Sequence, residues 1–260
     1  MIPELVAALS LAEGAAWSAF VVFLRIGAMM ALLPAFGETV VPVRVRLALG
    51  LAFTAIVWPA LQSGIPLPPT DAIRLAGLVL AETGTGVFLG LVLRLFVITL
   101  QVTGTIAAQS TSLSQIFGGT AGADPLPAMG HVLLVAGLAL AALLDLHVRI
   151  AEFLIFSYDL IPAGRIPSPQ IVVEAGVAQI GRSFALAFSL AAPFLVASLL
   201  YNVTLGVINR AMPQLMVAFV GAPAITAGSL ILLFLTAPII VGLWSEELFR
   251  FLHSPFGSVP

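Results

Sequence analysis

The sequence lacks cysteine and lysine altogether, and only 8% of its 260 residues are charged. Without cysteine, the chain forms no disulfide, no zinc–thiolate site and no thiol nucleophile. Without lysine, all ten basic residues are arginines, whose planar guanidinium groups tolerate burial beside a carboxylate. A GC-rich codon bias would explain the missing lysine equally well.

The few charges are nearly balanced and do not cluster. Ten basic and twelve acidic residues give a formal net charge of −2, which argues against nucleic acid as a partner. An ordinary soluble domain has roughly 25% charged residues, whereas this chain is 60% hydrophobic. The composition therefore indicates a protein built for lipid or for burial in a larger assembly. The first 24 residues contain no basic residue, unlike a cleavable signal peptide, and we expect them to be retained.

Enzyme motifs are also missing. The sequence has no HExxH, no GxSxG and no recognisable catalytic pair of carboxylates. The segment GTGVFLG, residues 84–90, lacks the preceding strand and the following lysine of a phosphate-binding loop. Its Gly86 and Gly90 instead favour the close approach of two helices. We therefore expect no enzyme, no catalytic residue, no metal and no cofactor.

Long apolar stretches dominate the chain. A membrane-spanning helix needs about 20 mainly apolar residues, and six stretches qualify: 15–36, 43–61, 73–117, 129–161, 171–209 and 222–252. Four of them are too long for a straight span, and the stretch 73–117 must tilt, break into two helices or project out of the bilayer. Prolines inside the stretches should kink or break them: Pro59, Pro193 and Pro238. The expected fold is all-α and polytopic, with about six long, kinked helices or helical hairpins.

The arginines of the connecting loops give no membrane orientation. With six spans, one side receives Arg44, Arg46 and Arg210, and the other receives Arg74, Arg165 and Arg250. Three against three leaves the positive-inside rule undecided. The equal count is expected if partner proteins set the orientation of the chain. It is expected equally if one of the segment boundaries is wrongly placed.

Several charges lie inside the apolar stretches, where they mark a functional pathway or a buried protein contact: Arg25, Glu82, Arg94, Asp145, Arg149, Glu152, Glu174 and Arg182. Asp145, Arg149 and Glu152 are spaced to share one helix face. We interpret them as a buried ion-pair stripe, with part of a proton relay as the alternative. His147 lies off that face, which weakens any metal or relay site.

The segment IAAQSTSLSQIFGGTAGADP, residues 106–125, is polar and rich in glycine. Its polar groups must face water, line a cavity or be buried in protein. The segment is therefore either a re-entrant or pore-closing loop or an ordinary exposed connection. Ile116 and Phe117 are candidates for an apolar constriction.

Three further stretches together resemble one family, the FliR proteins of the bacterial flagellar export apparatus, which are related to the SctT proteins of injectisomes. They are LRIGAMMALLPAFGETVVPVRVRLALGLA at 24–52, HVRIAEFLIFSYDLIPAG at 147–164 with GTIAAQ at 104–109, and NRAMPQLMVAFVGAP at 209–223. The chain departs from the family at Gln109-Ser110-Thr111 and at Asp145-Leu146-His147. The ending Gly221-Ala222-Pro223 favours the flagellar branch.

The resemblance implies a subunit of the type III export gate in the bacterial inner membrane, at the flagellar basal body. Its implied partners are FliP and FliQ homologues, FlhB and FlhA homologues, unfolded flagellar substrates and membrane lipid, without nucleic acid. Residues 1–164 would form a FliP-like part, and residues 165–260 a FliQ-like helical hairpin. The gate would conduct and close without bond chemistry.

Two sets of residues follow from this resemblance. A plug that closes the gate would comprise Gln109, Ile116, Phe117, Gly118, Gly119, Gly122, Asp124 and Pro125. Subunit docking would involve Arg44, Arg46, Arg210, Pro213, Gln214, Gly221 and Pro223.

Other functions remain open. A stand-alone secondary transporter or channel for a small solute would use Arg25, Arg94, Asp145 and Glu152 as a site near the membrane midplane. The injectisome homologue is a second alternative. An intramembrane enzyme is a third, for which no nucleophile or metal constellation is recognisable.

Overall fold

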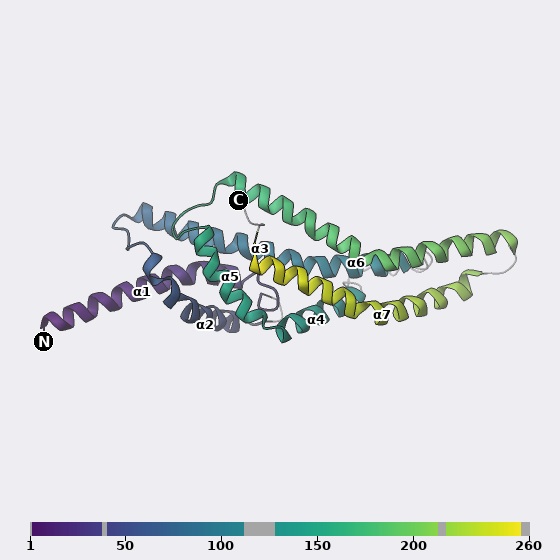
Figure 1. Cartoon of the computed structure of the whole chain (residues 1–260), viewed down its shortest axis with the longest axis horizontal. Coiled ribbons are helices and arrows are strands. Elements are labelled where there is room, and N and C mark those ends of the chain that lie inside the picture. Colours follow the sequence, from purple (N-terminus) through teal and green to yellow (C-terminus); the bar gives the residue numbers. More distant parts are fainter. Residues whose placement is uncertain (1, 38–40, 112–127, 213–216, 256–260) are drawn as a thin grey trace. The chain divides into compact units, whose positions relative to one another are not determined.

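The computed structural model describes the backbone of residues 2–37, 41–111, 128–212 and 217–255. These residues form seven α-helices and one short 3-10 helix, without a strand in the described ranges (Figure 1). The expected all-α fold is confirmed. The elements are α1 (Ile2–Met30), α2 (Val43–Leu61), η1 (Gln62–Gly64), α3 (Ala72–Thr111), α4 (Ala128–Leu143), α5 (Leu146–Leu160), α6 (Pro169–Ala211) and α7 (Val217–His253).

Two of the expected long stretches turn out differently from each other. The stretch 129–161 breaks into α4 and α5 at Asp145, whose φ of 60° lies in the left-handed region. By contrast, α3 is one helix of 40 residues, which at about 1.5 Å per residue measures about 60 Å, twice the thickness of a bilayer's hydrocarbon core. No break occurs at Pro59, Pro193 or Pro238, since α2, α6 and α7 continue through them.

The chain divides into two compact units that interleave in sequence. Unit 1 comprises Met1–Leu95, Asp145–Gln179 and Phe249–Pro260, and unit 2 comprises Phe96–Leu144 and Ile180–Leu248. Their boundaries fall inside α3, α6 and α7. These units are defined by contacts within the chain. The boundary expected after residue 164 is based instead on resemblance to FliP and FliQ, and it stays a prediction.

The core of unit 1 contains one face of α1. Its buried residues recur every three or four positions: Val21, Val22, Arg25, Ile26, Met29 and Met30. This is the period of a helix that packs on one side only, and α1 packs against α2 while α2 contacts α5. On α3, a Cβ atom at Gly86 would overlap the carbonyl oxygen of Arg25, and one at Gly90 would lie 2.9 Å from Cβ of Leu32. The close approach predicted for these two glycines is therefore confirmed, and the segment that they meet is α1 with the turn that follows it.

The core of unit 2 is organised around Trp244 of α7. Its side chain is 0% exposed, and its indole Nε1 donates a hydrogen bond of 2.8 Å to the carbonyl oxygen of Phe96 on α3. The backbones of α3 and α4 come into close contact at Gly104 and Gly130, where a Cβ atom on Gly104 would overlap the backbone of Gly130. Glycine at both positions permits this approach.

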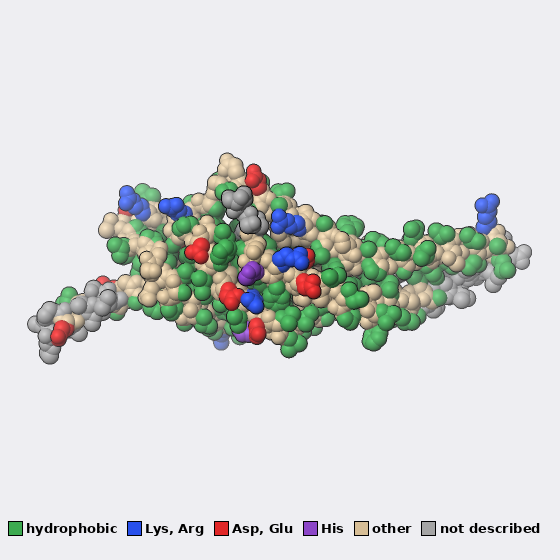
Figure 2. Space-filling view, viewed as in Figure 1, with side chains coloured by type: hydrophobic (Ala, Val, Ile, Leu, Met, Phe, Trp, Pro, Cys, Tyr) green, Lys and Arg blue, Asp and Glu red, His purple; other side chains and the backbone are tan. Residues whose placement is uncertain are grey.

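Among the described residues, five helices are long and apolar enough to cross a membrane, or six if α4 and α5 count as one broken span. The five are Ala12–Met30, Val43–Gly64, Ala72–Ser110, Pro169–Ala211 and Ala224–His253. Much of their apolar surface is uncovered, and in Figure 2 hydrophobic side chains extend over the visible surface of α6 and α7 in unit 2. These spans and this surface agree with the expectation of a membrane-associated chain.

Candidate functional site

A buried ion pair joins α1 to α3 inside unit 1. Arg25 Nε lies 2.9 Å from Glu82 Oε2, and both side chains are 0% exposed. Arg25 Nη2 also donates to Glu82 Oε1 at 3.2 Å, so the guanidinium and the carboxylate meet through two parallel hydrogen bonds. This bidentate arrangement is the strongest geometry for such a pair.

The other donors of Arg25 bind the end of α5. Its Nη1 donates to the carbonyl oxygen and to Oγ of Ser157, at 3.1 and 3.3 Å. Its Nη2 donates to the carbonyl oxygen of Ile161 at 2.9 Å. Carbonyl groups in the last turn of a helix have no partner within that helix. Arg25 therefore caps the C-terminus of α5 from a different helix.

Glu82 is equally saturated. In addition to Arg25, its Oε2 accepts a hydrogen bond from Tyr158 Oη at 3.3 Å, and its Oε1 accepts one from the backbone N–H of Gly164 at 2.7 Å. The guanidinium carbon of Arg25 lies 3.6 Å from the centroid of the Tyr158 ring, a favourable cation–π distance. Arg25, Glu82, Ser157 and Tyr158 are buried, and Gly164 at their edge is exposed. These five residues, called the buried cluster below, tie together three helices and the turn that follows α5.

The hydrogen-bond donors of Arg25 are all used within unit 1. An arginine has five N–H donors, and all five of those on Arg25 have an acceptor. A buried charge without its partner is strongly destabilising, by about 3–5 kcal/mol. The geometry therefore supports a positioning role for the pair, and Arg25 has no donor left for a solute.

Only an indirect signal in the sequence points to this cluster. Arg25 and Glu82 each stand out as a charge in an apolar stretch, but 57 positions separate them, so no helical spacing links them. A buried charge needs an opposite charge nearby. From the sequence alone, this need for an opposite charge is the signal that could have paired Arg25 with Glu82.

The predicted ion-pair stripe on α5 is corrected by the structure. Arg149 Nη1 lies 3.0 Å from Glu152 Oε2, but these side chains are 51% and 57% exposed. Asp145 precedes the first turn of α5 with a φ of 60°, so it does not continue the helical face. Expecting a three-residue buried stripe was wrong, because the predicted continuous helix breaks at Asp145.

The predicted plug residues fall mainly outside the described part of the chain. Gln109 is exposed in the last turns of α3. The others lie outside the described residues: Ile116, Phe117, Gly118, Gly119, Gly122, Asp124 and Pro125. Their role stays a prediction.

The predicted docking residues lie at helix ends where the structure describes them. Arg44 and Arg46 are in the first turn of α2, and Arg46 Nε donates to the carbonyl oxygen of Val41 at 3.0 Å. Arg210 is exposed in the last turn of α6. Gly221 and Pro223 belong to α7, and Pro213 and Gln214 are outside the described residues. No contact within the described chain tests their docking role.

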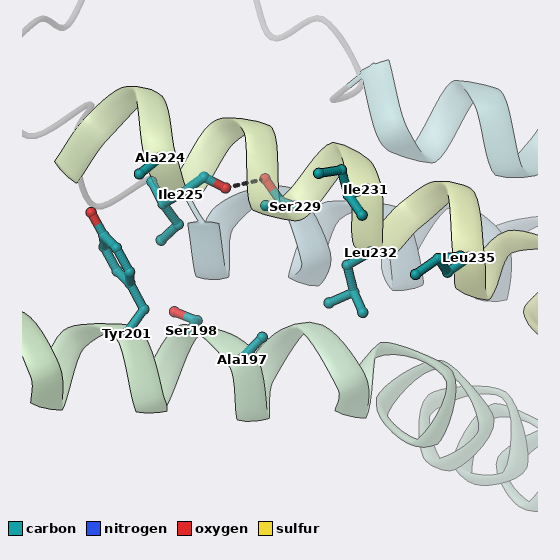
Figure 3. Close-up of a pocket in the computed structure, with 10 residues that line it drawn as sticks. Ala197, Ser198, Tyr201, Ala224, Ile225, Ser229, Ile231, Leu232 and Leu235 are labelled. Carbon is teal, nitrogen blue, oxygen red and sulfur yellow. Dashed lines mark hydrogen bonds between the residues drawn. The ribbon is translucent and has the colours of Figure 1, made fainter. Parts of the chain in front are cut away.

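A cavity of about 290 Å³ lies between α6 and α7 in unit 2. In Figure 3, Tyr201 points from α6 towards α7, where Ser229 Oγ donates to the carbonyl oxygen of Ile225 at 2.7 Å. The Tyr201 hydroxyl oxygen is buried and has no hydrogen-bond partner among the described residues. The lining is otherwise made mostly of small and aliphatic residues, so it presents few polar groups that could bind or react with a ligand.

Comparison with known proteins decides the family. The family model described as bacterial export proteins, family 1, matches residues 16–251. The chain belongs to this family. The match includes both members of the buried ion pair and the whole of α2 to α6.

The chain is also similar to several proteins named flagellar biosynthetic protein FliR. The protein of Caulobacter vibrioides is 31% identical over 230 residues, covering 88% of this chain and 92% of that protein. The protein of Pectobacterium carotovorum is 28% identical over 230 residues, covering 87% and 86%. The protein of Escherichia coli is 27% identical over 243 residues, covering 91% and 92%. The resemblance inferred from the sequence is thus confirmed, as is its flagellar character.

Proposed function

We propose that the chain is a subunit of the flagellar type III protein export gate, where it helps to form and close the channel for unfolded flagellar subunits. The observation that carries this proposal is the family match over residues 16–251. In this role it acts in the bacterial inner membrane at the basal body, with FliP and FliQ homologues as co-subunits and with FlhB and FlhA homologues nearby.

The exposed apolar surface of α6 supports an assembly with other proteins. Exposed apolar side chains extend from Ile171 to Ile208, a distance of about 56 Å along a helix. A tilt of about 58° would be needed to fit this length into a hydrocarbon core of about 30 Å, whereas spanning helices tilt by at most about 40°. Lipid alone cannot cover this surface, so we assign the remainder to partner subunits.

The long helices α6 and α7 also support the proposed division of the chain. They have 43 and 37 residues and both line the cavity in unit 2, as the two arms of a helical hairpin do. We assign residues 165–260 to a FliQ-like hairpin and residues 1–164 to a FliP-like part.

The assembly is tested by co-expressing the tagged chain with FliP and FliQ homologues and purifying it in a mild detergent. We expect a complex of all three. A stable monomer that binds a small solute would overturn the proposal in favour of a transporter. That alternative relied in part on Arg25, whose donors are all engaged inside unit 1.

The docking role of Arg210 is tested in the same purification. We expect Arg210→Ala to reach the membrane at its normal level but to recover less of the partner subunits. Arg74→Ala is the control, because Arg74 is also an exposed arginine near a helix end, in the first turn of α3, and lies outside the proposed docking residues. Equal recovery of partners by both variants would contradict a docking role for Arg210.

The plug is proposed for residues 109–124, with Ile116 and Phe117 as its apolar contacts and its glycines giving mobility. This proposal rests on the polar, Gly-rich sequence and on the family resemblance. Deleting residues 110–122 in a cell that assembles the gate should cause ion leakage and poor growth in an ion-rich medium. Unchanged impermeability would reject the plug.

A further inference from the structure

The turn between α5 and α6 is held from outside by the buried cluster. Arg25 Nη2 binds the carbonyl oxygen of Ile161 at 2.9 Å, where α5 has just ended. Glu82 Oε1 accepts the backbone N–H of Gly164 at 2.7 Å. Both contacts lie within unit 1, and together they attach the start of the turn to α1 and α3.

The backbone of the turn is shaped for this contact. Gly164 has a φ of +74°, a conformation that residues with a side chain disfavour. The N–H of Arg165 donates to the carbonyl oxygen of Pro162 at 3.1 Å, closing a short loop around Gly164. The first residue of α6, Pro169, follows shortly after Arg165. The hydrogen bond from Gly164 to Glu82 therefore anchors the chain to α3 five residues before α6 begins.

We propose that the Arg25–Glu82 pair is a latch for the α5–α6 turn, defined here as residues 161–168. The intact pair holds the turn against α3. Loss of the Glu82 charge releases the turn while the helices of unit 1 stay folded. The latch is a property of the chain itself and does not depend on the proposed export function.

The chain carries its own reporter of an open turn. Arg165 is exposed and is the only basic residue between Arg149 and Arg182. Trypsin cleaves after arginine but needs a locally unfolded segment, so its rate at Arg165 follows the population of the open turn. Cleavage after Arg25, which is 0% exposed, reports the unfolding of unit 1 as a whole.

The test uses the full-length chain in a mild detergent, with trypsin and identification of the fragments by mass. Glu82→Gln keeps the shape of the side chain and removes its charge, and we expect cleavage after Arg165 to become at least about 100-fold faster. Gly164→Ala changes the donor side of the same hydrogen bond, because alanine disfavours the positive φ at this position. We expect the cleavage rate after Arg165 to rise by about 5- to 30-fold. Glu152→Gln is the matched control and should change the rate by less than about fivefold, because that carboxylate is exposed.

Two results would overturn the latch. The first is the same cleavage rate after Arg165 in the original chain, in Glu82→Gln and in Gly164→Ala. The second is a rise after Arg25 that keeps pace with the rise after Arg165, which would show that the pair stabilises all of unit 1 rather than the turn. A selective rise after Arg165 in both variants supports the latch.

Discussion

Replacing Gly86 by alanine tests the close contact between α1 and α3 in unit 1. A Cβ atom there would overlap the backbone carbonyl oxygen of Arg25 and would lie 3.0 Å from Cβ of Ala28. Backbone atoms cannot rotate away, so α1 and α3 must separate. Glu82 lies one helical turn before Gly86 on α3, and the same separation would stretch the buried ion pair.

Gly84→Ala provides a matched control for the magnitude. Gly84 lies on the same helix, and a Cβ atom there would meet nothing within 4 Å. Both substitutions gain the same helix propensity, about 1 kcal/mol, so this gain cancels in the difference between them. The remaining difference is the cost of overpacking, about 1–3 kcal/mol. We expect a value at the upper end of this range, because the overlap involves backbone and weakens an ion pair.

The assay is unfolding of the full chain in mixed micelles with increasing denaturing detergent, followed by far-UV circular dichroism. Gly84→Ala should unfold at or above the midpoint of the original chain, and Gly86→Ala clearly below it. Equal midpoints for the two variants would refute the close contact of α1 with α3 at Gly86.

Three further predictions use the same unfolding assay. Trp244→Phe should cost about 1–3 kcal/mol, because it removes the hydrogen bond to Phe96 and leaves a void, whereas Phe234→Leu at an 81% exposed position should change stability by less than about 0.5 kcal/mol. Arg149→Met should cost at most about 1 kcal/mol, because the ion pair of Arg149 with Glu152 is exposed. In the isolated chain, Arg44→Gln should be stabilising and Arg210→Gln destabilising, each by about 0.3–1 kcal/mol; the same sign for both would contradict the helix-dipole argument.

Features with a local cause were predictable from the sequence. Apolar stretches of sufficient length indicated the helices. The spacing of Gly86 and Gly90 indicated a close contact with another helix, but it did not indicate which helix. The pairing of Arg25 with Glu82 was not predictable by spacing, since it depends on which helices become neighbours in the fold.

The break between α4 and α5 was missed for a different reason. The sequence Leu144-Asp145-Leu146 contains neither glycine nor proline, the usual signals of a break. Aspartate is among the few residues that adopt the left-handed conformation at modest cost, and Asp145 does so. Nothing in the neighbouring residues distinguishes this aspartate from one that continues a helix.

The positions of the arginines on their helices separate two kinds of docking candidate. Arg210 lies in the last turn of α6, where the negative end of the helix dipole favours a positive charge. Its presence there is explained without any partner. Arg44 lies in the first turn of α2, which has no side-chain cap and no acidic residue, so the positive end of the dipole opposes it. A positive charge that is opposed by the dipole of its own helix gains more from a negatively charged partner than a charge that the dipole already stabilises. Arg44 is therefore the sharper candidate for a contact with an acidic group of a partner subunit.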